Sequence, residues 1–132
     1  MTLSMRKAQQ TRSLVSAWFD FMPPTEAPVA QAIHKAIRAT VSDLGETIRQ
    51  GNLLMSMNGE PLLAIAPARN QVHLLIFNGS ELESELGPLE GVARRQRVVR
   101  FNCNVPVDVS RVEQIARAAA EYCRRHQALA GE

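Results

Sequence analysis

Apolar residues recur every three to four positions in three parts of the chain, and this spacing predicts three helices. Residues 1–13 are polar and mildly basic, so we expect a flexible N-terminal arm there. The first helix is expected from Leu14 to the Pro23-Pro24 pair. Trp18 and Phe19 within it are interpreted as packing anchors.

The second helix is expected to begin at Thr25 or Glu26 and to end between Asp43 and Gln50. One wide apolar stripe runs along it, composed of Val29, Ile33, Ala36, Ile37, Thr40, Val41, Leu44 and Ile48. The third helix is expected after Ser110, which with Glu113 has the spacing of a capping box. Its inner stripe consists of Val112, Ile115, Ala116, Ala119, Tyr122 and Cys123.

Between the second and third helices the pattern changes to short apolar runs typical of strands, at residues 53–57, 62–66 and 72–77. Asn58-Gly59 and Arg69-Asn70 separate these runs, and connections this short make neighbouring strands antiparallel. A basic strand at 97–101 follows a short helix that is expected to open at Ser80 and to end at Gly87-Pro88. The predicted fold class is therefore α+β: an antiparallel meander sheet of about four to five strands packed against N- and C-terminal helices, in one domain spanning 14–127.

Neither face of this predicted sheet is polar. Leu54, His73, Leu75 and Phe77 fall on the face opposite to the row of Val72 and its alternates. Because a half-exposed sheet alternates between apolar and polar positions, both faces need cover. The long helices cover one face. For the other we expect, in this order, the Trp18/Phe19 segment, a second copy of the chain, or an apolar ligand groove.

Composition and charge limit the classes of protein to which this chain can belong. A chain of 132 residues with 45% hydrophobic and 21% charged residues is typical of one folded domain. The net charge of +2 disfavours a globally basic nucleic-acid binder. No signal peptide and no membrane-spanning run is found, and the two cysteines lack metal spacing, so we expect a cytoplasmic protein with reduced thiols.

The run VHLLIFNGSELESELGPLEGVARRQRVVRF, followed by VDVSRVEQIARAAAEY, resembles the YdhG-like proteins, a bacterial family grouped as domain of unknown function 1801. The resemblance covers roughly residues 15–125. The matching positions are Phe77, Gly79, Leu82, Leu89, Glu90, Gly91 and Arg97, whereas Ala93, Arg94, Ser84 and Leu53 depart from the family pattern.

The resemblance implies an α+β sandwich distantly related in shape to frataxin, and some relatives are described as iron chaperones. Iron delivery of that kind uses an acidic helix face, because iron prefers carboxylate oxygens. The corresponding helix here carries Gln31, Lys35 and Arg38, so we do not transfer iron binding, and no cofactor is expected.

The candidate site with the most specific chemistry is an anion cradle around the loop before the basic strand. Arginines and exposed glycine-loop amides bind phosphate or carboxylate. The candidate residues are Glu90, Gly91, Arg94, Arg97 and Arg100. The alternative is that Arg94 and Arg95 are solvated while Arg97 and Arg100 pair with Glu81, Glu90 or neighbouring acids, Glu90 then fixing the loop.

No catalytic residues are predicted, because no nucleophile lies in a triad context and no Walker, dinucleotide or zinc-hydrolase motif is present. His73 and Cys103 are the remaining candidates for a metal or acid–base pair, and a buried histidine is the alternative.

We therefore expect a non-enzymatic binding or interaction module, with a homodimer through the second sheet face as one form of it. A carrier of a small anionic ligand or a metal is the alternative. Nucleic-acid contact through the Arg94–Arg100 cluster is disfavoured, since few aromatic residues are available for stacking.

Overall fold

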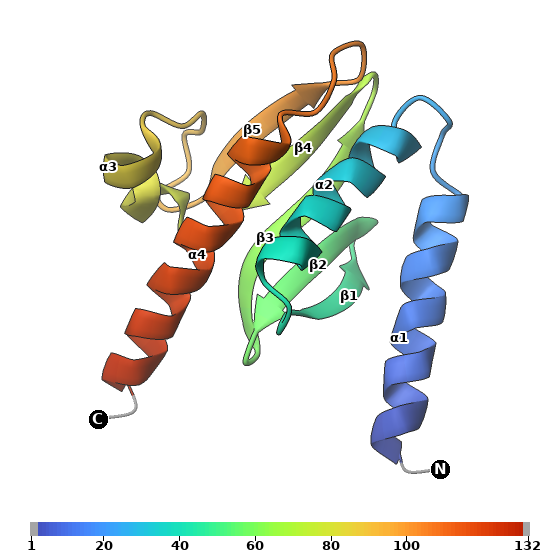
Figure 1. Cartoon of the computed structure of the whole chain (residues 1–132), viewed down its shortest axis with the longest axis horizontal. Helices are drawn as coiled ribbons and strands as arrows, with labels where there is room; N and C mark the ends of the chain where they lie inside the picture. The colour runs from blue at the N-terminus through green and yellow to red at the C-terminus, as the bar shows by residue number, and fades with distance from the viewer. Residues whose placement is uncertain (1–2, 131–132) are drawn as a thin grey trace.

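The structure, a computed structural model, describes residues 3–130 and has the predicted α+β architecture, an antiparallel sheet backed by helices (Figure 1). The elements in chain order are α1 (Leu3–Asp20), α2 (Ala27–Thr40), β1 (Gly45–Arg49), β2 (Asn52–Met57), β3 (Glu60–Ala68), β4 (Gln71–Ile76), the 3-10 helix η1 (Gly79–Leu82), α3 (Glu83–Leu86), β5 (Arg97–Asn102) and α4 (Val109–Ala130).

The sheet has five strands in the order β1-β2-β3-β4-β5, and every neighbouring pair is antiparallel. This confirms the predicted meander. The Asn58-Gly59 turn has φ values of 50° and 84°, and Asn70 in the next turn has φ of 61°. Asparagine and glycine tolerate positive φ better than other residues, which explains why the chain reverses at these points.

The main core lies between one face of the sheet and the helices α2 and α4. Leu74 and Ile76 of β4 are fully buried there, together with Ile33 and Ile37 of α2 and Ile115 of α4. Burying one such side chain contributes about 1.5–3 kcal/mol, so this layer supplies most of the stability. The alanines of α4 that face the core, Ala116 and Ala119, let the helix approach the sheet closely.

The first helix begins at Leu3 and not at Leu14, so the segment predicted to be a flexible arm is helical in its described part. The sequence from Leu3 to Arg12 contains no glycine or proline and is rich in Met, Arg, Lys, Ala and Gln, all of high helix propensity. Propensity, rather than an apolar stripe, accounts for this extension. The mobility of the segment stays a prediction.

The second helix ends at Thr40, and the strand β1 replaces its predicted last turns. Val41 already has extended dihedrals, with φ −130° and ψ 106°. The helical spacing of Leu44 and Ile48 misled the sequence interpretation, because two apolar residues four apart also fall on the same face of a strand.

Both predicted capping boxes are wrong. Neither η1 nor α3 has a side-chain cap, although Gly87 with φ of 84° ends α3 as expected. At α4, the Asp108 side chain and not Ser110 accepts a hydrogen bond, from the Arg111 backbone N–H at 3.1 Å. Aspartate is as good an N-cap as serine, so the sequence does not distinguish Asp108 from Ser110, which lies two residues further on.

Helix α1 does not cover the second face of the sheet. It lies beside β1 at one edge, next to α2 (Figure 1). Trp18 donates a hydrogen bond from Nε1 to the Gly51 carbonyl at 2.8 Å, and the ring of Phe19 packs on His34 of α2 at a centroid distance of 5.2 Å. The predicted self-coverage is therefore wrong, and no helix within residues 3–130 lies over that face.

Candidate functional site: the open face of the sheet

The face of the sheet opposite α2 and α4, here called the open face, has an apolar floor. Leu54 of β2 pairs with Ala64 of β3, Ala64 with Leu75 of β4, and Leu75 with Val98 of β5. Leu54 and Ala64 are only 6% and 3% exposed, yet neither belongs to the main core cluster. The apolar row is therefore a second, separate feature of the sheet.

A hollow of about 380 Å³ lies over this row. Small-molecule sites in proteins generally range from about 300 to 1,000 Å³, so the hollow has the size of a small ligand site. Its apolar lining consists of Leu54, Pro61, Ala64, Leu75 and Phe77, and its polar lining of Arg49, Gln50, Asn52 and Gln96.

Two backbone features shape the hollow. The register between β2 and β3 shifts at Met55/Ser56, next to Pro61, which lacks the N–H needed for a regular ladder. Such a bulge bends a strand and increases its twist. The β1–β2 turn has positive φ at Gln50 (53°) and Gly51 (81°), as in tight hairpins, and this turn brings Arg49, Gln50 and Asn52 to the rim.

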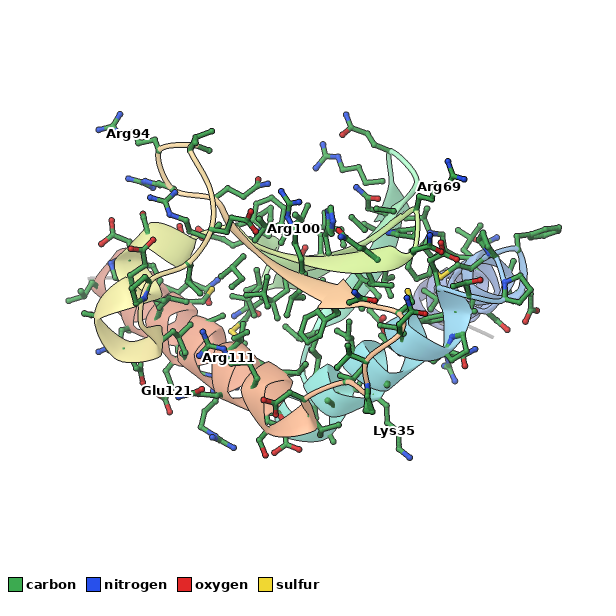
Figure 2. The ribbon with its side chains drawn as sticks, turned by 90° about the horizontal axis from the view of Figure 1, so that it is seen from above. Lys35, Arg69, Arg94, Arg100, Arg111 and Glu121 are labelled. Carbon is green, nitrogen blue, oxygen red and sulfur yellow. The ribbon has the colours of Figure 1, made fainter. Side chains whose placement is uncertain are left out.

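The open side of the sheet is basic. In Figure 2, Arg69, Arg94 and Arg100 extend on this side, whereas Lys35 and Glu121 lie on the side of α2 and α4. Arg49 lines the hollow itself. The carboxylate of Glu90 pairs with Arg100 at 3.0 Å, and both side chains are about half exposed. This pair carries no net charge, so the positive charge of the open side comes from Arg49, Arg69 and Arg94.

Arg97 lies in a different environment from Arg100. Its Nε donates to the Glu83 carboxylate at 2.7 Å, and NH1 donates to the carbonyls of Ala93 and Gln96. A Cβ added to Gly79 would lie 2.4 Å from the Arg97 Cβ, and one added to Gly91 would lie 3.1 Å from its Cδ. Two glycines therefore make room for this arginine, which holds the loop between α3 and β5 in place.

The structure does not gather the predicted anion cradle into one cluster. Arg97 is bonded to Glu83 and to carbonyls of the loop, and Arg100 pairs with Glu90. Arg94 is exposed (Figure 2). Gly91 serves the packing of Arg97. The pairing anticipated as the alternative is present: Arg100 pairs with Glu90, and Arg97 pairs with Glu83, one of the neighbouring acids. Anion binding at the loop itself stays a prediction.

His73 and Cys103 are not brought together. His73 lies on the open face, where it shares a hydrogen bond with Gln71 at 2.9 Å, and Cys103 packs against the main core. Burial and then the charge of Arg100 lower the pKa of His73, while Glu90 opposes them. Burial, with a contribution from Glu26, raises the pKa of Cys103. Within residues 3–130 no group of three or more metal-ligating side chains is assembled.

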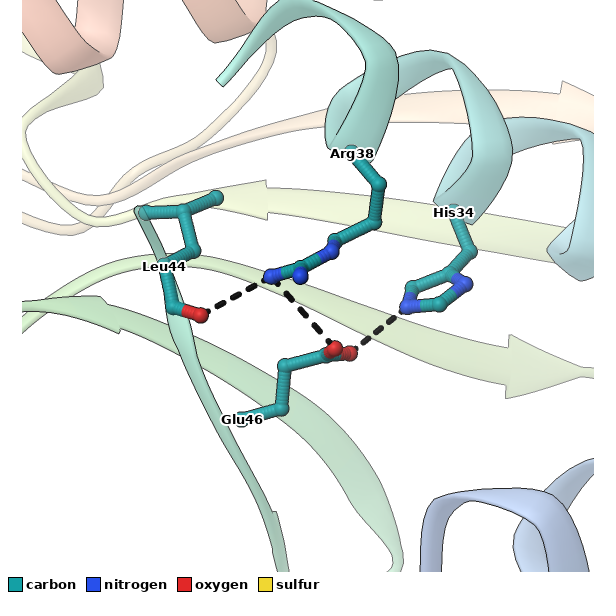
Figure 3. A network of polar contacts seen from close by, with 4 residues as sticks. All are labelled: His34, Arg38, Leu44 and Glu46. Atoms are coloured by element: carbon teal, nitrogen blue, oxygen red, sulfur yellow. Dashed lines mark hydrogen bonds and ion pairs between the residues drawn. The ribbon is translucent and has the colours of Figure 1, made fainter. Parts of the chain in front are cut away.

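One polar network was missed by the sequence interpretation (Figure 3). His34 Nε2 lies 2.6 Å from Glu46 Oε2, and Arg38 donates to the Leu44 carbonyl at 2.8 Å while its NH1 lies 3.6 Å from Glu46 Oε1. The network fastens α2 to β1. The sequence does not predict it, because the spacing of Leu44 and Ile48 favours a helix where the structure has β1.

A comparison with known structures supports the fold. The chain is similar to the crystal structure of YdhG, a protein of the DUF1801 family from Bacillus subtilis, with a TM-score of 0.61. The match covers 76% of this chain and 83% of the other. The chain has the YdhG-like fold. At 12% identity the likeness is one of fold alone, and it confirms the predicted α+β meander.

By sequence, no protein family and no curated protein matches the chain. The helices within residues 3–130 include none that is long and apolar enough to cross a membrane. A function for this chain therefore has to be inferred from the open face and not from a related protein.

Proposed function

We propose that this protein is a non-enzymatic binding module and that the open face of its sheet is the binding surface. The observation that supports this most is the hollow over Leu54, Ala64 and Leu75, which no helix of residues 3–130 covers. Leu75 and Phe77 of its lining are partly exposed, and apolar side chains that water reaches in a hollow are typical of a site that a ligand covers.

The groups around the hollow are suited to binding rather than to proton transfer. Guanidinium and amide groups orient a ligand but keep their protonation state near neutral pH. Neither His34 nor His73 lines the hollow. His34 shares a hydrogen bond with Glu46, and His73 shares one with Gln71.

A homodimer through the open face is less well supported than a ligand. Two copies packed face to face would bring the positive charges of Arg49, Arg69 and Arg94 of one copy toward those of the other, and like charges repel. Nucleic acid is also a weaker candidate, because Phe77 is the one aromatic ring in the lining of the hollow. A cytoplasmic location remains the expectation for a protein of this kind.

The test is a titration of the ¹⁵N-labelled protein with a fragment panel of mixed charge. We expect amide shifts to change at residues around the hollow. Ala64→Phe should fill the hollow and abolish these changes, while Ala66→Phe, on the same face of β3 but outside the hollow lining, should preserve them. Fragments that bind only between the helices, or none that bind at all, would refute the proposal.

A further inference from the structure

The proposed function leaves the chemistry of the ligand open, and the lining of the hollow restricts it. Among the arginine side chains that the structure describes, those engaged in ion pairs are Arg38, Arg97, Arg100 and Arg124. Arg49 at the rim forms no ion pair in the described part of the chain. A guanidinium that borders an apolar floor matches an organic carboxylate, which accepts two parallel hydrogen bonds from it.

The floor requires an apolar body in the ligand. Ala64 lies between Leu54 and Leu75 across the strands, so a small side chain is flanked by two larger ones. Leu75 is partly exposed beside this pair, so a flat ring can cover it, and the Phe77 ring in the same lining offers an aromatic contact. An inorganic anion would leave Leu75 and Phe77 partly exposed to water, and a neutral hydrocarbon would leave Arg49 without a charge partner.

The size and surroundings favour a small molecule over a peptide. A hollow of about 380 Å³ is at the small end of the range for ligand sites. A peptide that adds a strand needs a free sheet edge. Here α1 packs along β1, and Glu90 already bridges to Val98 of β5.

We propose that the hollow binds a small flat aromatic carboxylate, with its carboxylate on Arg49 and its ring over Leu54, Ala64 and Leu75. The inference rests on the proposed function. The side-chain amides of Gln50, Asn52 and Gln96 line the same hollow, where they can form hydrogen bonds with a second polar group on the ring.

The test compares 2-naphthoate with its neutral isostere 2-naphthamide by calorimetry and by amide shift mapping. We expect both to perturb residues of the hollow and the carboxylate to bind about tenfold more tightly, which corresponds to about 1.4 kcal/mol. Arg49→Gln should bring the two affinities together without lowering the melting temperature, because Arg49 is exposed. Arg69→Gln, which removes an arginine on the same side but outside the lining, should preserve the preference.

The outcomes separate this inference from the proposed function. Equal binding of both compounds at the hollow would refute the carboxylate assignment and leave the binding module standing. Shifts at the hollow from neither compound and from no fragment of the panel would refute both. A preference that survives Arg49→Gln but is lost in Arg94→Gln would move the anion to the loop and overturn the inference. Displacement of naphthoate by lower concentrations of a glutamate-rich peptide or an oligonucleotide would overturn the small-ligand assignment.

Discussion

Leu74 and Leu75 are neighbours in β4, yet they serve opposite faces of the sheet. Leu74 is fully buried against the helices, and Leu75 lines the hollow on the open side. The same alternation divides β5, where Phe101 and Arg97 face the helix side and Arg100 faces the open side. One face is thus packed against the helices, and the other carries the apolar and basic groups of the proposed binding surface.

The largest difference in stability between the two faces should come from truncating Leu74 and Leu75 to alanine. Leu74→Ala leaves a cavity in the main core and should lower the free energy of unfolding by about 2–5 kcal/mol. Leu75→Ala should cost less than half as much, because its side chain is partly solvated. Urea unfolding of both variants measures this, and equal losses would mean that the open face contributes to folding as the core does.

The next effect concerns the space around Arg97. Gly79→Ala places a Cβ 2.4 Å from the Arg97 Cβ, so the loop must shift, at a cost of about 1–3 kcal/mol. Gly45→Ala is the matched control, since the nearest atom to its Cβ would be the Ser56 carbonyl oxygen at an ordinary 3.8 Å. Thermal unfolding compares them. A harmless Gly79→Ala would contradict the close packing of this arginine.

Arg97 and Arg100 test the comparison within one strand. Arg97→Met keeps an apolar stem but removes three hydrogen bonds that hold the loop, and it should cost about 1–2 kcal/mol. Arg100→Met breaks a half-exposed pair and should change stability by less than about 0.5 kcal/mol. Urea unfolding measures both, and hydrogen exchange of the loop amides should rise only in Arg97→Met.

The smallest expected effect is the pH dependence of folding stability that His73 contributes. Its pKa is lowered in the folded protein, by burial first and then by Arg100, so the unfolded chain binds the proton more readily. Stability is therefore fully present above the unfolded value near 6.5 and falls as the pH drops through the lower folded pKa. Ring titration by NMR should give a higher pKa in Arg100→Gln. An unchanged or lower value would remove Arg100 as a cause.

Much of the fold was predictable, because it rests on local signals. Asn58-Gly59 fixes a hairpin, and the stripe of Val112 and Ile115 fixes α4. The edge strand β1 was not predictable from Leu44 and Ile48, whose spacing fits a helix equally well. Here the pairing of this segment with β2, and not its own sequence pattern, selects the strand over the helix.

The site was less predictable. The sequence indicated that the second sheet face is apolar, but not that α1 leaves it open. The roles of Arg97 and Arg100 depend on which face each side chain takes, and a shift of one residue in register exchanges the faces. The partnership of Arg97 with Glu83 joins residues fourteen apart through a loop whose path no local rule gives.

The most direct test of the open face as the binding surface is the set of intermolecular NOEs between the ring protons of 2-naphthoate and leucine methyl groups. We predict NOEs to Leu54 and Leu75 and none to the core residues Leu53 and Leu74. NOEs to methyl groups among the helices alone, or no intermolecular NOE at saturating ligand, would contradict the account.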